Sequence, residues 1–293
     1  MLNIRTFRVD DIGLGLELCR LAGWNQLEAD WRRLLALAPD GVFIAEEDER
    51  PCGSGSTTLY GTQTAWIGMI LVHPDFRKRG IGTAIMDKLI AHLRAQNIES
   101  IKLDATDLGR PVYLKLGFKD ERPIHRYKGQ RPPGIAASSE ARPITSSDWP
   151  AIARLDRAAF DADRLELLKI LSGEGVTAVV VPSSPREENR LEACSTGDVH
   201  GYGFARKGFH ASFLGPVVAT DSVAARAVVE TLLARLAEGE VYWDILTDNV
   251  ASTELAELLG FTVARKLVRM YLGDRVNPGN VNLVYGAAGF ELG

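Results

Sequence analysis

The chain has 293 residues, of which 46% are hydrophobic and 25% charged, and its formal net charge is −4. These values are typical of a globular protein long enough for two domains, and the acidic balance argues against a general nucleic-acid-binding protein. The first residues, MLNIR, lack a signal-peptide pattern, and no apolar run approaches the ~20 residues of a membrane helix. The sequence therefore predicts a cytoplasmic protein without membrane or nucleic-acid partners.

Cysteine usage adds a second exclusion. The three cysteines, Cys19, Cys52 and Cys194, are scattered and odd in number, and none stands at a metal-ligand spacing. We expect neither a disulfide framework nor a metal site.

The first half contains a strand, a turn and a long helix in that order. The apolar run WIGMILV (66–72) predicts a strand, and in IGTAIMDKLIAHLRAQ (81–96) apolar residues recur on one helical face. The run SIKLDAT (100–106) predicts the next strand. A strand, a helix and a strand form a right-handed crossover, so the turn before the helix lies at the carboxyl end of a strand.

That turn is RKRGIG (77–82), which joins three cations to two glycines. The first N–H groups of a helix have no partner within the helix, and Gly80 and Gly82 permit close approach of a ligand to the backbone. The pattern predicts a pyrophosphate site. A Walker-type nucleotide site is excluded because no Gly-Lys-Ser/Thr sequence follows.

A Pro-, Gly- and Ser-rich stretch divides the chain near its middle. We place one domain at 1–128, a linker at 129–140 and a second domain at 141–293. A second such stretch, 182–198, lies between two strand-like runs and predicts a long hairpin loop.

The two halves resemble each other. WIGMILV (66–72) is matched by FLGPVVA (213–219), and YLKLGF (113–118) by LAELLGF (255–261). Each half is expected to contain a strand, two helices, a strand meander, a crossover, a short helix and a closing strand. The second half has lost four residues between these anchors, in the segment that corresponds to RKRGIG.

Two motifs of the first half carry a resemblance to a known family. ILVHPDFRKRGIGTAIMDKL and GRPVYLKLGFKDE, within residues 65–121, resemble the strand, pyrophosphate loop and Tyr-x-x-x-Gly-Phe element of the GNAT superfamily of acyl-CoA-dependent N-acyltransferases. AGWNQLEADW (22–31) and VNLVYGAAGFELG (281–293) resemble a subfamily with two tandem GNAT-like halves. The resemblance implies an α/β (α+β) fold of two mixed-sheet domains flanked by helices, and acetyl-CoA as the cofactor.

The resemblance also implies how the cofactor is held. The strand backbone would pair with the pantetheine arm, the loop amides would bind the pyrophosphate, and the residue seven before the tyrosine would contact the arm. The residues so implied are Ile70, Leu71, Val72, Arg77, Lys78, Arg79, Gly80, Ile81, Gly82, Thr83 and Thr106. At that last position the superfamily often has asparagine.

The catalytic roles are only partly assigned. Tyr113 stands where the superfamily often keeps its general acid, and a phenol is close enough in pKa to a thiol for useful proton transfer. Several members carry a glutamate on the strand before the loop, but the register here gives Trp66. His73, Asp104 or a water chain remain possible bases, and His73 is better explained as a turn residue beside Pro74.

The second half keeps the apolar pattern and loses the phosphate loop. Its TDSVAARA (220–227) offers neither glycines nor a basic cluster, and Ala256 replaces the tyrosine, although Asn249 stands at the asparagine position. We therefore expect one active site, in the first half. The second half would wall the acceptor pocket, form a homodimer, or bind a ligand of its own.

The acceptor is expected to be a primary amine of a small molecule. Asn25 and Gln26, in a turn where superfamily members often meet the acceptor, are the predicted acceptor contacts, and Trp24 is better explained as a core residue. The alternatives are an acetyltransferase of protein lysines or N-termini and a non-catalytic acyl-CoA-binding module.

Overall fold

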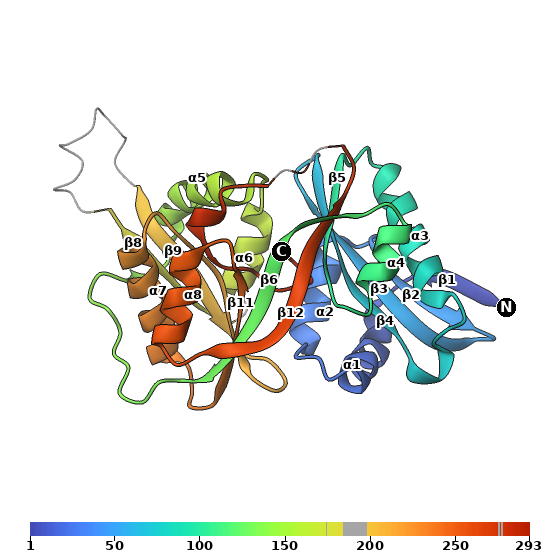
Figure 1. Cartoon of the computed structure of the whole chain (residues 1–293), viewed down its shortest axis with the longest axis horizontal. Coiled ribbons are helices and arrows are strands. Elements are labelled where there is room, and N and C mark those ends of the chain that lie inside the picture. The colour runs from blue at the N-terminus through green and yellow to red at the C-terminus, as the bar shows by residue number, and fades with distance from the viewer. Residues whose placement is uncertain (174, 184–197, 275, 277) are drawn as a thin grey trace.

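The computed structural model describes residues 1–173, 175–183, 198–274, 276 and 278–293. Two sets of elements follow one another along the chain (Figure 1). The first set is β1 (Leu2–Thr6), η1 (Val9–Asp11), α1 (Ile12–Leu21), α2 (Glu28–Leu37), β2 (Val42–Glu47), β3 (Arg50–Tyr60), β4 (Thr64–Val72), η2 (Pro74–Phe76), α3 (Ile81–Arg94), β5 (Ser100–Ala105), α4 (Arg110–Lys115) and β6 (Lys119–Gln130).

The second set repeats this order. It is β7 (Arg142–Pro143), η3 (Ser146–Asp148), α5 (Trp149–Phe160), α6 (Leu165–Gly173), β8 (Thr177–Pro182), β9 (Val199–Arg206), β10 (Ser212–Ala219), α7 (Ser222–Arg235), β11 (Glu240–Leu246), α8 (Val250–Leu258) and β12 (Thr262–Leu272). The predicted internal repeat is confirmed. The chain then continues through η4 (Val281–Leu283) and β13 (Val284–Gly286), which have no counterpart after β6.

Helix α3 shows why the local predictions succeed. Its apolar residues recur at helical spacing, and all six of those on the predicted face are buried: Ile81, Ile85, Met86, Leu89, Ile90 and Leu93. Strands β4 and β5 on either side of it are parallel, as the crossover requires. In the other half, β8 and β9 pair as an antiparallel hairpin, and most of the predicted connection (184–197) lies outside the described residues.

All strands of both halves belong to one mixed sheet. Its order is β1-β2-β3-β4-β5-β12-β6-β11-β10-β9-β8-β7, with β13 paired to β10. The two halves therefore exchange their last strands. Strand β12 of the second half pairs with β5 of the first, and strand β6 of the first half pairs with β11 of the second. Strands β6 and β12 run side by side through the middle of the molecule (Figure 1).

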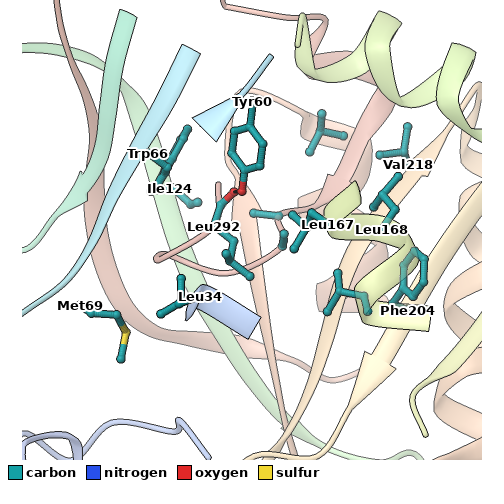
Figure 2. Close-up of a cluster of buried hydrophobic side chains, with 14 of the residues drawn as sticks. Leu34, Tyr60, Trp66, Met69, Ile124, Leu167, Leu168, Phe204, Val218 and Leu292 are labelled. Carbon is teal, nitrogen blue, oxygen red and sulfur yellow. Dashed lines mark hydrogen bonds between the residues drawn. The ribbon is translucent and has the colours of Figure 1, made fainter. Parts of the chain in front are cut away.

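This exchange ties the two halves together, and no local sequence pattern predicts it. Strand β6 includes residues 129 and 130, so the linker predicted at 129–140 begins inside this strand. A buried cluster also spans both halves, with Leu34 and Tyr60 on one side and Leu168 and Phe204 on the other (Figure 2). Among the described helices, none combines the length and apolar character needed to cross a membrane.

The segment after β13, residues 287–293, lies between the halves and contacts β3 and β4. The Trp66 Nε1–H donates to the Phe290 carbonyl at 3.0 Å, and the Tyr60 hydroxyl donates to the Leu292 carbonyl at 2.7 Å. Figure 2 shows Tyr60 directed at Leu292. The closing residues of the second half are thus packed on the strand that begins the predicted site of the first.

Candidate active site

Strand β4 leaves part of its backbone edge free. It pairs with β5 only from Thr64 to Trp66, although β4 continues to Val72. Met69 has a positive φ of 54°, and the pairing of β4 with β3 shifts register at this point, so β4 bulges there. The edge from Ile70 to Val72 is therefore open toward β5, as an added extended chain would require.

The turn before α3 presents backbone N–H groups. Lys78 (φ 63°) and Gly80 (φ 81°) both adopt left-handed conformations, and turns of this kind gather successive amides into an anion-binding concavity. Gly80 is the N-cap of α3 and offers no side chain to accept the first helical N–H groups. Gly82 and Thr83 follow in the first helical turn. The predicted pyrophosphate site is therefore formed by backbone, at an open helix N-terminus.

Two of the three predicted cations are used by the protein itself. The Arg79 guanidinium donates to the Glu47 carboxylate at 2.8 Å and to the Asp75 carbonyl at 3.0 Å, and Arg77 Nε–H donates to the Val72 carbonyl at 3.2 Å. Lys78 is exposed, and no hydrogen bond or ion pair to it is found within the described chain. Lys78 is thus the cation of this turn that remains available to a ligand.

Tyr113 lies in α4, on the first half's α3 side of the sheet. Its ring packs against Phe118, with centroids 6.0 Å apart, and a Cβ at Gly109 would lie 2.8 Å from the ring. Burial raises the pKa of the Tyr113 phenol to about 12, so the hydroxyl stays protonated and can donate a proton throughout the physiological range. Thr106 Oγ1 accepts the Gly109 N–H at 3.2 Å and closes the turn before α4.

Both side chains considered as a base are engaged elsewhere. Asp104 is buried and holds the Arg269 guanidinium through two hydrogen bonds of 2.9 and 3.1 Å. His73 caps η2, where its Nδ1 accepts the Asp75 N–H at 3.3 Å. The turn interpretation of His73 is thereby supported.

Asn25 and Gln26 lie close together but differ in what they contact. The Asn25 side chain is fully used: its Oδ1 accepts the N–H groups of His210 and Ala211, and its Nδ2 donates to the Ala211 carbonyl at 2.9 Å. Asn25 therefore holds the β9–β10 loop against the first half. Gln26 Oε1, by contrast, is buried without a hydrogen-bond partner. Gln26 is the better candidate for contacting an acceptor.

Both residues line a small cavity on the face of β4 opposite α3. The cavity measures about 10 Å³, close to the space of one water molecule. Its lining comes from both halves and consists of Asn25, Gln26, Asp30, Arg126, Arg206, Lys207, Phe213 and Glu291. The C-terminal segment thus supplies a carboxylate to this cavity, a feature that local sequence patterns gave no means of finding.

The second half fills both places that the first half leaves open. β13 pairs with β10 at Val217 and Val218, and the Ala287 N–H donates to the Asp244 carbonyl of β11 at 2.8 Å, so the chain itself lies along the free edge. At the N-terminus of α7, the Asp221 carboxylate accepts the N–H groups of Val223 and Ala224. A cofactor held as in the first half would meet protein at both positions.

No cluster of three or more His, Cys, Asp or Glu side chains suited to a metal ion occurs in the described part of the chain. Cys19 and Cys52 are buried free thiols, and Cys194 lies outside the described residues.

Comparison with known proteins gives two family matches, one in each half. Residues 16–118 match the model described as "Acetyltransferase (GNAT) family", and residues 152–286 match the model described as "Acetyltransferase (GNAT) domain". The chain is 24% identical over 254 residues to the uncharacterized N-acetyltransferase YitH of Bacillus subtilis (84% of this chain, 83% of YitH). It is also 24% identical over 273 residues to a holothin acyltransferase of Pseudoalteromonas sp. (92% and 87%).

Solved structures share the whole arrangement. A putative acetyltransferase from Pyrococcus horikoshii superposes with a TM-score of 0.83 at 23% identity, covering 100% of this chain and 96% of that one. A tandem GNAT protein from the clavulanic acid biosynthesis pathway superposes with a TM-score of 0.66 at 17% identity, covering 93% and 98%. These matches establish the tandem two-domain fold.

Proposed function

Because the chain belongs to the GNAT family of acetyltransferases, we propose that it transfers an acetyl group from acetyl-CoA to the primary amine of a small molecule, by direct transfer in a ternary complex. The observation that carries the proposal is the open edge of β4 beside the open N-terminus of α3. The same two places are filled by protein in the second half. One catalytic site, in the first half, follows.

The residues present fit the cofactor that this family uses. The edge from Ile70 to Val72 offers backbone groups for a pantetheine arm, with the Val72 carbonyl already bound by Arg77, and the amides between Arg79 and Thr83 offer donors for a pyrophosphate. Lys78 adds a cation at the rim. When bound, acetyl-CoA supplies an activated thioester whose sulfur leaves as a thiolate.

The protein would contribute a proton donor and an apolar surface that excludes water. Tyr113 would donate its hydroxyl to the departing sulfur. Burial keeps the phenol protonated, and because its pKa of about 12 lies above that of a thiol, full transfer of the proton is uphill and accompanies breaking of the C–S bond. The apolar side chains of α3 and β4 exclude water from one face of the site. The acceptor would approach from the opposite face, where Gln26 lies.

A small-molecule acceptor agrees better with the structure than a protein does. The cavity beside Gln26 has room for a group about the size of one water molecule, such as the amine head of a small acceptor, whereas a peptide needs an extended groove. The names of two similar proteins, a holothin acyltransferase and a tandem GNAT protein of clavulanic acid biosynthesis, also refer to metabolites.

The test is an assay of thiol release from acetyl-CoA with a panel of ethanolamine, histamine, tyramine, glucosamine and a lysine-containing peptide. We expect turnover with at least one small amine and none with the peptide. Preferred turnover of the peptide would favour a protein acetyltransferase. Coenzyme A binding without turnover of any amine would favour a binding module.

A further inference from the structure

The C-terminal segment places a carboxylate-bearing residue directly over β4. A Cβ built on Gly68 would lie 2.8 Å from Glu291 Cα and 2.9 Å from Glu291 Cβ. Glu291 therefore occupies the volume that a side chain at position 68 would fill, one residue before the bulge at Met69. Strand β4 has no carboxylate of its own, and Glu291 supplies one to this face from the far end of the chain.

Several hydrogen bonds fix the backbone on both sides of Glu291. Trp66 Nε1–H binds the Phe290 carbonyl, and the Tyr60 hydroxyl binds the Leu292 carbonyl. The buried Arg164 guanidinium, itself held by Asp156, donates to the Gly293 carbonyl at 2.9 Å. Such anchoring limits the freedom of Glu291 and holds its side chain in the cavity.

The Glu291 carboxylate is buried and forms an ion pair with Arg206 that is too long to be a hydrogen bond. Its residue is 6% exposed, and the nearest cation, Arg206 Nη2, lies 3.7 Å from Oε1, beyond hydrogen-bond range. The Arg206 guanidinium donates instead to the carbonyls of Gly215 and Ala288. Burial raises the pKa of the Glu291 carboxyl above its usual value, which makes the carboxylate a stronger base.

We propose that Glu291 is the proton acceptor of the reaction, receiving a proton from the acceptor's ammonium group directly or through one water molecule in the cavity. This proposal rests on the proposed function. The N–H bond breaks and an O–H bond forms on Glu291; the freed nitrogen lone pair attacks the thioester carbon, and the C–S bond breaks. The departing sulfur takes its proton from Tyr113. The nitrogen loses its second proton to water as the amide forms, water returns a proton to the Tyr113 phenolate, and Glu291 releases its own proton to solvent. The second half thus completes the active site of the first.

The charged groups that face Glu291 come from several elements. They are Asp30 of α2, Arg126 of β6, Arg206 at the end of β9 and Lys207 directly after it. Arg33 of α2 and Asp244 of β11 act on Arg206 in turn. Asp30 and Asp244 each hold an arginine through short hydrogen bonds, Arg33 and Arg126 respectively. Glu291 is the carboxylate of the cavity that has no such bond to an arginine, so it is the one available for proton transfer.

The test compares Glu291→Gln with wild type in the full chain. Gln keeps the size and removes the base, so we expect kcat/KM for the best amine of the panel to fall by roughly 10²- to 10⁴-fold, while the Kd for coenzyme A by calorimetry stays unchanged. The residual rate should rise with pH in proportion to the free amine. Wild-type activity with an unchanged pH profile would overturn the proposal.

A double variant separates catalysis from charge balance. If Glu291 only neutralised the charge of Arg206, the double variant Arg206→Gln/Glu291→Gln would regain activity. If Glu291 is the proton acceptor, we expect the double variant to stay as slow as Glu291→Gln. Should the double variant fail to fold, the pH profile of the single variant still decides.

A binding readout keeps this proposal distinct from the proposed function. Calorimetry of histamine with the coenzyme A complex should show binding to wild type and at least tenfold weaker binding to Glu291→Gln. Equal binding to both, together with wild-type turnover by Glu291→Gln, would overturn the role of Glu291. If histamine binding requires Glu291 but no amine is acetylated, the proposed acetyl transfer is wrong, whereas the contact between Glu291 and the amine stands.

Discussion

The two halves fold alike and differ at the two places where a cofactor would be held. In the first half the edge of β4 is open and α3 begins at Gly80 without a side-chain cap. In the second half β13 lies along β10, and Asp221 caps α7. The second half keeps the apolar pattern that forms the fold, and its own groups occupy the positions at which the proposed cofactor would be held in the first half. Each difference can be tested by exchanging residues between the halves.

The largest effect is expected from Gly82→Val, which gives the second position of α3 the residue that α7 has there, Val223. A Cβ at Gly82 would lie 3.7 Å from the Val72 side chain, an ordinary contact, so the protein should fold with an unchanged Tm. The branched side chain would stand in the amide concavity, and we expect coenzyme A binding to weaken by more than about 100-fold. The matched control Val223→Gly changes an exposed residue and should leave binding intact. Normal calorimetric affinity in Gly82→Val would refute the backbone site.

Tyr113→Phe comes next and removes the hydroxyl that the second half lacks at Ala256. We expect kcat and kcat/KM to fall together by about one to three orders of magnitude, because the proton is needed only as the thiolate forms. Since the pKa of Tyr113 is about 12, the phenol stays protonated up to that pH, and wild type should show no alkaline limb from this group below about pH 11. Single-turnover kinetics provide the measurement. An unaltered chemical step in the variant would remove Tyr113 from the mechanism.

Asp221→Ala opens the helix N-terminus of the second half. Burial works against the charged form of Asp221, but hydrogen bonds from Ala224, Thr220 and Val223 outweigh it and lower the pKa of the carboxyl. The cap therefore stabilises the protein above the unfolded pKa of about 4 and is lost as pH falls through the lower folded value. Losing such a cap costs ~1 kcal/mol, so Tm at pH 7 should drop by about 2–4 °C. Coenzyme A should still bind with a stoichiometry of one, because β13 continues to cover β10; a second bound equivalent would show that Asp221 alone blocked the site.

Lys78→Ala should have the smallest effect. Lys78 is an exposed charge screened by salt, whereas in the proposed site the backbone amides of the turn would make most of the contacts to the pyrophosphate. We expect the Kd for coenzyme A to rise by no more than about fivefold, and less at high ionic strength. A loss greater than that of Gly82→Val would mean that charge, and not backbone geometry, defines the site.

The sequence by itself determined whatever depends on neighbouring residues. Helical spacing marked the buried face of α3, glycines marked the turn before it, and the repeated order of elements marked the tandem fold; all three are confirmed. The missing glycines of the second half pointed to a single cofactor site, which remains a prediction.

Only the tertiary structure decided which distant segments meet. The exchange of β6 and β12 depends on which edge each strand pairs with, and strands of similar composition can satisfy their hydrogen bonds on either edge. Likewise, no pattern near WIGMILV predicts that a carboxylate from Glu291 lies over this strand. The position of Glu291 depends on the pairing of β13 with β10. It also depends on hydrogen bonds from Trp66, Tyr60 and Arg164 to the residues that follow β13. These contacts join residues far apart in the sequence, so no local spacing predicts them.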